Sequence, residues 1–217
     1  YNDKREKRME STVMEELYNS VTNFDEEAAE AAANKALEVG IDPYKAIVEG
    51  LTPAIKEVGE KFEKGDLFLP HLVMAGDAMM AAVNILEKKI PREELESTIK
   101  GRIVLGTVKG DVHSIGKNIV GIMLTCAGYK VYDLGIEVDH SKFIDEAEKV
   151  NADIIAVSAL MTFTAQNMAT LHEFMTAEGI RDKYLLLFGG GPLTEKWAKE
   201  MGADAYIPKD KMVDISL

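Results

Sequence analysis

Cysteine and basic residues are scarce in this sequence of 217 residues. The one cysteine, Cys126, has no partner for a disulfide within the chain, so we expect a small apolar core residue in a protein of the reducing cytoplasm. The formal net charge of -12 argues against binding to the phosphate backbone of nucleic acids, which requires basic surfaces. No window resembles a membrane span, because the longest apolar runs are the size of strands, and no basic segment followed by an apolar one opens the chain. We therefore predict a cytoplasmic protein that binds neither nucleic acid nor membranes.

Two common catalytic signatures are also missing. The triple glycine Gly189–Gly191 lacks the lysine of a phosphate-binding P-loop, although exposed amides at a helix start would still suit a phosphate. Ser158 is not part of the G-x-S-x-G turn that presents the serine of many hydrolases. A hydrolase triad of Ser158, His113 and Asp111 is therefore not favoured.

The first part of the chain, residues 1–89, has helical periodicity only. Asp42 suits an N-cap, and Pro43 suits the first position of a helix, where its missing N–H costs nothing. Pro53 lies inside the same stretch and should kink or split the helix. We predict a four-helix bundle, with helices within residues 7–21, 24–40, 41–65 and 70–89.

The pattern changes after residues 90–101, a charged stretch with a proline that we interpret as a linker and hinge. Beyond it, five short apolar runs alternate with helical patterns, which predicts a parallel sheet covered by helices on both faces. We therefore expect an all-α bundle domain over residues 1–89 and a flavodoxin-like α/β domain over residues 102–217. The five strands are expected near residues 102–108, 130–135, 153–160, 184–188 and 203–207.

Unusual residues follow three of the five expected strands. In the strand order 2-1-3-4-5 of flavodoxin-like sheets, the loops after the first, third and fourth strands meet at one edge. Open parallel sheets bind their ligands at this edge. The first loop holds Asp111, His113 and Gly116, the second holds Ser158, Leu160 and Thr164, and the third holds Gly189, Gly190 and Gly191.

His113 follows Asp111 by two residues in the first of these loops. One ring nitrogen could bind a metal while the Asp111 carboxylate accepts the N–H of the other and fixes the tautomer. A bare zinc or iron site needs three or four protein ligands. Beside His113 and Asp111, this loop holds no further histidine or carboxylate and no cysteine. If His113 binds a metal, the other ligands must therefore come from a macrocycle. Gly110 and Gly116 would let the backbone turn sharply, and the triple glycine would leave a slot for a flat or threaded ligand.

Three short motifs in these loops resemble the signature of a known family. The stretches DVHSIG (111–116), SAL (158–160) and GG (189–190) are similar to the D-x-H-x-x-G, S-x-L and G-G motifs of cobalamin-binding domains. The likeness extends over nearly the whole chain, because methyltransferase-type corrinoid proteins carry a helical bundle before a flavodoxin-like domain. The family includes the cobalamin module of methionine synthase and the corrinoid proteins of methylamine, methanol and methoxy-aromatic metabolism.

The resemblance implies a role for each motif. His113 would be the lower axial ligand of cobalt, Asp111 would accept a hydrogen bond from it, and Thr164 would add a hydroxyl group to this relay. The nucleotide tail of the cofactor would thread past Ser158 and the triple glycine, where the pair Gly191-Pro192 departs from the family pattern and would alter contacts to the tail. Phe62 and Leu69 would form a cap over the methyl-bearing face. The residues implied to bind the cofactor are Asp111, His113, Ser114, Ile115, Gly116, Ser158, Leu160, Thr164, Gly189, Gly190, Gly191, Phe62 and Leu69.

The resemblance also implies a function, that of a methyl carrier with cobalamin or a related cobamide in its cobalt(I), cobalt(II) and methylcobalamin states. The carrier would accept a methyl group on cobalt(I) from a C1 substrate bound to one methyltransferase and pass it to a second methyltransferase. A third protein would provide reductive activation, and the chain would supply no catalytic residue beyond the cofactor. A methylamine is the expected donor, with methanol, methoxylated aromatics and quaternary amines left open. A cobalamin-dependent sensor and the cobalamin subunit of a mutase are the alternative functions.

Overall fold

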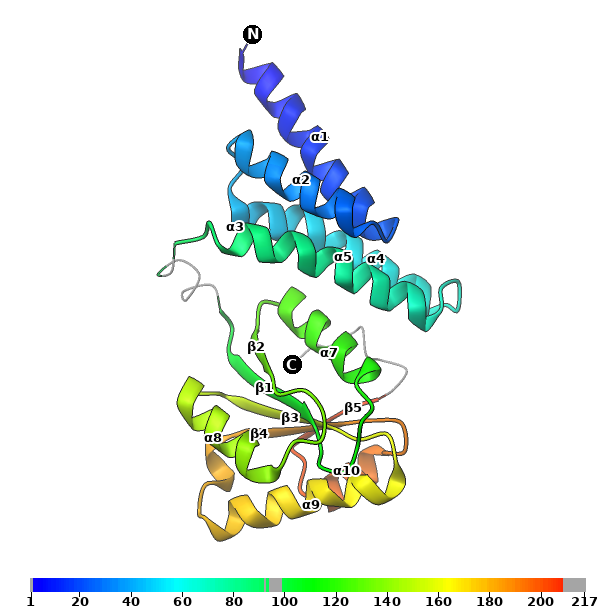
Figure 1. The fold of residues 1–217 in the computed structure, drawn as a ribbon, viewed down its shortest axis with the longest axis vertical. Coiled ribbons are helices and arrows are strands. Elements are labelled where there is room, and N and C mark those ends of the chain that lie inside the picture. Colours follow the sequence, from blue (N-terminus) through cyan, green and yellow to red (C-terminus); the bar gives the residue numbers. More distant parts are fainter. Residues whose placement is uncertain (1, 92, 94–98, 209–217) are drawn as a thin grey trace. The chain divides into compact units, whose positions relative to one another are not determined.

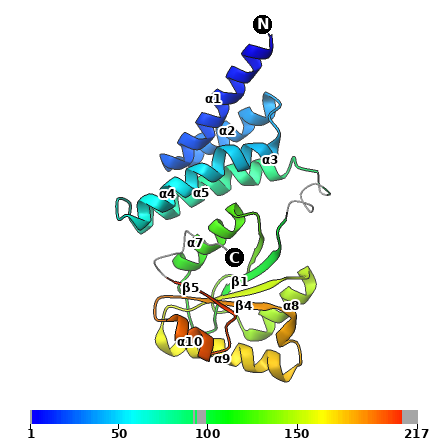
Figure 2. The same ribbon diagram turned by 180° about the vertical axis from the view of Figure 1, so that it is seen from behind.

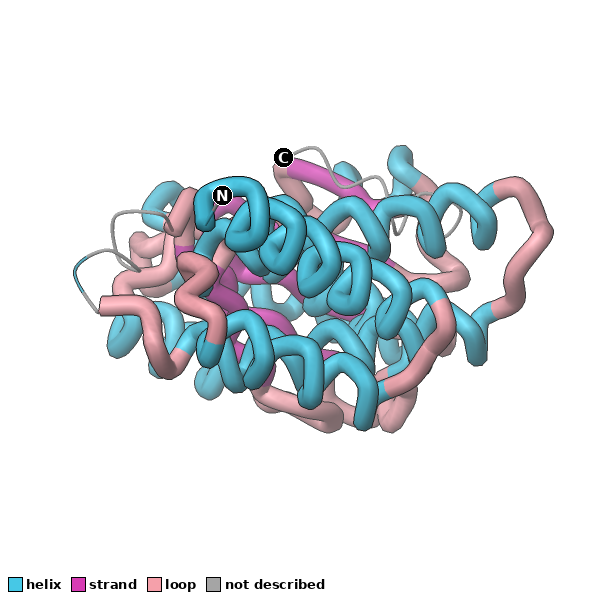
Figure 3. The backbone as a smooth tube through the Cα atoms, turned by 90° about the horizontal axis from the view of Figure 1, so that it is seen from above, coloured by secondary structure: helices cyan, strands magenta, loops and turns pink. Residues whose placement is uncertain are grey.

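The chain forms two compact units, residues 1–98 and residues 99–217, in its computed structural model (Figure 1). The structure describes residues 2–91, 93 and 99–208. All strands of the described chain belong to the second unit, whereas the first consists of helices and their connections. Figure 3 draws the helices in cyan and the strands in magenta. This arrangement confirms the predicted fold class. The linker expected at 90–101, the side chain of Cys126 and the segment after residue 208 lie wholly or partly outside the described part of the chain.

The first unit is a helical bundle around an aliphatic core (Figure 2). Its elements are α1 (Asn2–Thr22), α2 (Glu26–Glu38), α3 (Pro43–Lys45), a π-helical turn (Ala46–Leu51), α4 (Thr52–Glu63) and α5 (Leu69–Glu87). Leu17 of α1, Ala33 of α2, Ile55 of α4 and Met79 of α5 are fully buried. The four predicted helices are therefore present, and the third is divided into shorter pieces.

The third predicted helix divides just before Pro53. Asp42 caps its start as predicted, because the carboxylate accepts a backbone N–H three residues on at 2.7 Å, and Pro43 follows in the first turn. Further along, the N–H of Thr52 donates to the Ile47 carbonyl, one residue further back than in an α-helix, and the Thr52 hydroxyl donates to the same oxygen at 3.0 Å. This wider turn places Pro53, which has no N–H, in the first turn of α4.

Helix α5 corrects the expectation that no window of the sequence resembles a membrane span. Among the described residues, it is the helix whose 19 residues and mean hydropathy of 1.4 would suffice to cross a membrane. Nine of its residues, from Leu72 to Leu86, are buried within the helical unit. The helix is therefore apolar because much of it belongs to the core of the helical unit. His71, Asp77 and Asn84 divide its sequence into short apolar runs, although the mean hydropathy over the helix is high.

The second unit contains a five-stranded parallel sheet in the predicted order β2-β1-β3-β4-β5. The ends of all five strands lie within two residues of the predicted ends. The strands are β1 (Arg102–Thr107), β2 (Lys130–Asp133), β3 (Ile154–Ser158), β4 (Leu185–Gly189) and β5 (Ala205–Ile207). The connecting helices are α7 (Ile115–Cys126), α8 (His140–Val150), α9 (Thr162–Ala177), a 3-10 turn (Arg181–Lys183) and α10 (Glu195–Glu200).

Each face of the sheet has its own core, because alternate strand residues point to opposite faces. Val104, Ile155 and Phe188 belong to the core under α8, α9 and α10, whereas Ile103 and Leu187 belong to the core under α7. Figures 1 and 2 show these helices on opposite sides of the sheet. The layering leaves the loops at the carboxyl ends of the strands free to form a site.

Candidate functional site

Three loops lie side by side at the carboxyl edge of the sheet because neighbouring strands end in register. Thr107, the last residue of β1, pairs with Ser158 at the end of β3, and Ser158 pairs with Gly189 at the end of β4. The loops that follow carry the DVHSIG, SAL and GG motifs, so the structure places the three motifs next to one another.

The carboxylate of Asp111 is fully buried among these loops and accepts five hydrogen bonds. Its Oδ1 accepts Nδ1–H of the His113 ring at 2.7 Å and the His113 backbone N–H at 3.1 Å. Its Oδ2 accepts the backbone N–H groups of Leu160 and Met161 at 2.8 and 3.1 Å and the Thr164 hydroxyl at 2.6 Å. This one side chain therefore joins the first loop to the second loop and to α9.

The hydrogen bonds keep Asp111 ionised. Burial by itself raises the pKa of Asp111, but the hydrogen bonds from Thr164, His113 and the backbone lower it by more, so the pKa lies well below its ordinary value of 3.8. An ionised carboxylate can only accept hydrogen bonds. The Thr164 hydroxyl therefore donates its one proton to Asp111 at the shorter of its two contacts, the other being the Met161 carbonyl at 2.9 Å.

Asp111 thereby fixes which nitrogen of His113 carries a proton. Because the carboxylate accepts at Nδ1, that nitrogen carries the hydrogen, and Nε2 of the neutral ring keeps a free lone pair. Within the described part of the chain, Nε2 has no hydrogen-bond partner, and 45% of the side chain is exposed. The described residues contain no group of three metal-ligating side chains, so a metal at Nε2 would need most of its ligands from outside the protein.

Exposed apolar side chains occur in the segments that carry and contact Asp111 and His113. Val112 and Ile115 lie within two residues of His113 in the chain, Leu160 donates its backbone N–H to Asp111, and Phe163 precedes Thr164. Ile136 precedes Glu137, whose backbone N–H donates to the Asp111 carbonyl. We call these residues the apolar rim: Val112, Ile115, Ile136, Leu160 and Phe163. Their exposed fractions range from 43% to 67%. Large apolar side chains gathered at one exposed edge are typical of a binding site.

The glycine loop after β4 approaches the loop after β3 too closely for a side chain. Gly190 has a φ of 139°, and a Cβ atom there would lie 1.8 Å from the Ala159 carbonyl oxygen. A Cβ on Gly191 would lie 2.9 Å from Cδ1 of Leu160, whereas one on Gly189 would meet only ordinary contacts. The bare backbone of this loop therefore forms one wall of the site, beside the apolar rim.

The other predicted residues lie in several places. Ser114 and Ile115 begin α7, and Ser158 is half-buried at the end of β3. Gly116 was expected to allow a sharp turn, but it lies in the first turn of α7, so an ordinary helical conformation suffices; Gly110 has the left-handed φ of 83° that a turn requires. Phe62, half-buried in α4, and Leu69, exposed at the start of α5, both belong to the helical unit.

Three supporting residues were not predicted. The Thr107 side chain is fully buried and donates from Oγ1 to the His113 carbonyl at 2.9 Å. Asn167 donates from Nδ2 to the Lys109 carbonyl at 2.8 Å, and the side chain of Lys117 is almost fully buried. A threonine at a strand end and an asparagine on a helix are too common to indicate a function. The lysine directly after the DVHSIG motif is a signal that could have pointed to Lys117.

Comparisons with known proteins agree with this geometry. Two family models, each described as a B12 binding domain, match residues 13–87 and residues 101–211. The chain is 44% identical over 187 residues to trimethylamine corrinoid protein 2 of Methanosarcina acetivorans, covering 86% of each chain. It is also 44% identical over 194 residues to dimethylamine corrinoid protein 2 of the same organism, covering 89% of each.

Solved structures resemble the chain over nearly its whole length. A cobalamin-binding protein from Desulfitobacterium hafniense has a TM-score of 0.70 at 28% identity, over 93% of this chain and 95% of that one. The methanol:cobalamin methyltransferase complex of Methanosarcina barkeri has a TM-score of 0.78 at 25% identity, over 94% of this chain and 77% of that one. The loops with the three motifs thus occur in a fold that both the sequence and structure comparisons connect with B12.

Proposed function

The chain belongs to the B12-binding corrinoid proteins, and from this premise we propose that it carries methyl groups from a methylamine-specific methyltransferase to a second methyltransferase. The observation that carries this proposal is the free Nε2 of His113, held in its tautomer by the buried Asp111 carboxylate. A metal that takes a single protein ligand at this position must bring its other ligands with it, as a corrinoid does.

The residues present fit a corrinoid in three respects. One exposed imidazole is available as an axial ligand, the apolar rim suits the edge of a large flat ring, and the bare backbone at Gly190 and Gly191 suits a tail that passes close to the sheet. When bound, the corrinoid supplies a cobalt centre that accepts and donates a methyl group. His113 would hold this centre, Asp111 and Thr164 would keep the proton on Nδ1, and the rim would exclude water.

A methylamine is the favoured methyl source because corrinoid proteins named for trimethylamine and dimethylamine are 44% identical to this chain. The expected partners are a methyltransferase that binds the methylamine, a methyltransferase that takes up the methyl group and a protein for reductive activation. The methanol:cobalamin methyltransferase complex, to which this fold is similar, supports an assembly of this kind. Phe62 and Leu69 of the helical unit are proposed to shield the methyl-bearing face, and the protein is proposed to act in the cytoplasm.

The test is an absorption spectrum of the protein reconstituted with methylcobalamin, alone and as His113→Gly. We expect a histidine-coordinated spectrum in the unaltered protein and a shift to the base-off spectrum in the variant. His172→Gly, which removes a histidine on α9, is the matched control and should leave the spectrum unchanged. An unchanged spectrum in His113→Gly would remove this residue as the ligand. Preferential retention of adenosylcobalamin would instead support a mutase subunit or a sensor.

The methyl source is tested with partner methyltransferases specific for trimethylamine, dimethylamine, monomethylamine and methanol. The chain reduced to cobalt(I) is mixed with each partner and its substrate, and methylation is followed in the absorption spectrum. A methylamine should methylate it fastest. Faster methylation from methanol would contradict the assignment of the donor while leaving the carrier function intact.

A further inference from the structure

Lys117 is a lysine in an unusual environment. It lies in the first turn of α7, four residues after His113, and only 2% of its side chain is exposed. Its ammonium group donates to Oδ2 of Asp133 and to the Asn118 side-chain oxygen, the latter at 2.8 Å. Lysines are rarely buried to this extent unless they are paired, and here the pair spans two elements.

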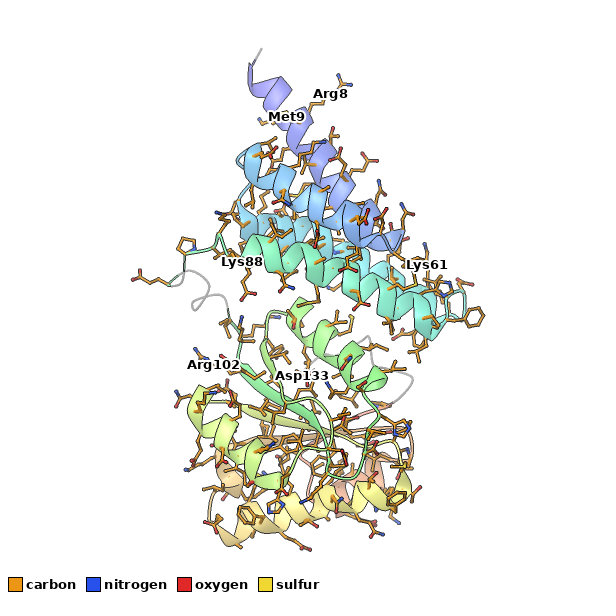
Figure 4. All side chains as sticks on the ribbon, viewed as in Figure 1. Arg8, Met9, Lys61, Lys88, Arg102 and Asp133 are labelled. Atoms are coloured by element: carbon orange, nitrogen blue, oxygen red, sulfur yellow. The ribbon has the colours of Figure 1, made fainter. Side chains whose placement is uncertain are left out.

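Asp133 connects this lysine to the loop between β2 and α8. It is the last residue of β2, labelled in Figure 4, and its carboxylate is partly exposed. Its second oxygen, Oδ1, accepts the backbone N–H of Gly135 at 2.8 Å. The ion pair therefore ties the first turn of α7 to residues 134–139, which we call the β2–α8 loop.

The β2–α8 loop contacts the backbone that carries His113. The Gly135 carbonyl accepts the Thr107 N–H at 3.0 Å, and the Glu137 N–H donates to the Asp111 carbonyl at 3.1 Å. Gly135 and Glu137 have left-handed φ values of 83° and 52°. Such a conformation is costly for a residue with a side chain and persists only where surrounding contacts enforce it.

We propose that Lys117 and Asp133 are positioning residues for the axial ligand. Their ion pair holds the β2–α8 loop in the shape that lets Glu137 bind the Asp111 backbone, so that the loop of His113 is held through the Asp111 backbone as well as through the Asp111 side chain. Neither side chain touches the Nε2 atom. The inference rests on the proposed function, because it presupposes that His113 is a ligand.

The principal test compares Lys117→Met and Asp133→Asn with the unaltered chain. Lys117→Met removes the buried charge, keeps a side chain of similar length and leaves a partly exposed aspartate that water can solvate. Asp133→Asn keeps an acceptor for Gly135 but removes the charge that Lys117 requires. Lys149→Met, which breaks the exposed pair with Glu146 in α8, is the matched control. Circular dichroism of each apoprotein confirms folding, and the double variant Lys117→Met/Asp133→Asn leaves no buried charge unpaired.

Two readouts separate positioning from general stability. Methylcobinamide, a corrinoid without the nucleotide tail, should bind about tenfold more weakly to Lys117→Met and to the double variant, with a smaller histidine-coordinated fraction in the absorption spectrum. In the apoprotein, hydrogen exchange at the Glu137 amide should accelerate about tenfold, because opening of the loop exposes that N–H.

Equal methylcobinamide binding, or equal exchange at Glu137, in the folded double variant and the unaltered chain would overturn the inference. A loss confined to Asp133→Asn and absent from the double variant would also overturn it, because it would reflect only an unpaired buried lysine. If His113→Gly itself leaves methylcobinamide binding unchanged, the proposed function fails instead. The two failures are therefore distinguishable.

Discussion

Asp111 and His113 act as a unit at the scale of single residues. The carboxylate accepts hydrogen bonds from the backbone N–H groups of Leu160 and Met161, from the Thr164 hydroxyl, and from the backbone N–H and the ring Nδ1–H of His113. Each of these donors stabilises the ionised form of the Asp111 carboxylate. The same bonds that orient the imidazole therefore also make the carboxylate important for stability.

The pH dependence of stability should identify Asp111. Folding lowers its pKa, so its contribution is complete above the unfolded pKa, near 3.8, and is lost as the pH falls towards the lower native pKa. In urea unfolding of the apoprotein, Asp111→Asn should cost about 2 kcal/mol or more at neutral pH, because buried N–H groups lose a charged acceptor.

Below about pH 4 the difference between Asp111→Asn and the unaltered chain should shrink, because Asp111 of the unfolded chain then binds a proton whereas the native carboxylate stays ionised. Asp145→Asn, on the exposed side of α8, is the control and should change stability little at either pH. A constant difference at all pH values would contradict the assigned ionisation.

Gly190 has a backbone requirement that no other residue can meet. Gly190→Ala should destabilise the apoprotein by more than about 3 kcal/mol, because the Ala159 carbonyl that the new methyl group would meet is backbone and must move. Gly179→Ala is the matched control, since its φ of 68° is also left-handed but nothing lies within 4 Å of a Cβ there. The control should lose only about 1 kcal/mol. Equal losses in urea unfolding would contradict the close approach of the two loops.

At the scale of elements, the sequence specified the sheet well. Each strand is a short apolar run, and the strand order was assumed from flavodoxin-like sheets, with the meeting of three unusual loops as support. The contact between Asp111 and Thr164, which are 53 residues apart in the chain, followed from the family motifs together with this strand order.

The burial of Lys117 and the conformation of the β2–α8 loop could not be predicted in the same way. Lys117 looks like a solvated residue in a helical pattern, and its burial depends on how α7 packs beside β2. The left-handed conformation of Glu137 has no sequence signal, since glutamate is not a residue that favours it. Both features arise from tertiary contacts, which periodicity does not encode.

The π-helical turn also has a specific packing requirement. Gly50 lies against α1, where a Cβ atom would be 3.1 Å from Cδ1 and 3.3 Å from Cβ of Leu17. Gly50→Val should therefore destabilise the protein by about 1 to 3 kcal/mol through crowding. Glu49→Val puts the same β-branched side chain on the exposed side of this turn and should cost less than about 1 kcal/mol. Thermal unfolding of both variants tests this, and equal costs would contradict the close packing of α1 on the turn.

At the scale of the whole molecule, charge is distributed unequally between the two units. Residues 1–98 contain 21 acidic and 12 basic residues, whereas residues 99–217 contain 16 and 13. The net charge of -12 therefore resides mainly in the helical unit. A charged surface of this kind affects the rate at which a partner of opposite charge associates more than it affects affinity.

Association with the partner methyltransferase should depend on the acidic helical unit. Replacing the exposed Glu30 and Glu38 of α2 with glutamine should lower the association rate about threefold at low salt, and the difference should vanish at high salt. The same change at the exposed Glu173 and Glu178 in or next to α9 is the control. Stopped-flow measurements that show equal rates for both pairs would contradict this role for the charge.

The ligand role of His113 is tested most directly by electron paramagnetic resonance of the holoprotein in its cobalt(II) form. Chain labelled with the heavy nitrogen isotope in histidine is compared with unlabelled chain. We predict that the splitting from the axial nitrogen changes from a triplet to a doublet on labelling, and that His113→Gly abolishes this change. A triplet that persists in the labelled protein would show that the axial nitrogen belongs to the cofactor, and it would contradict the account of the site.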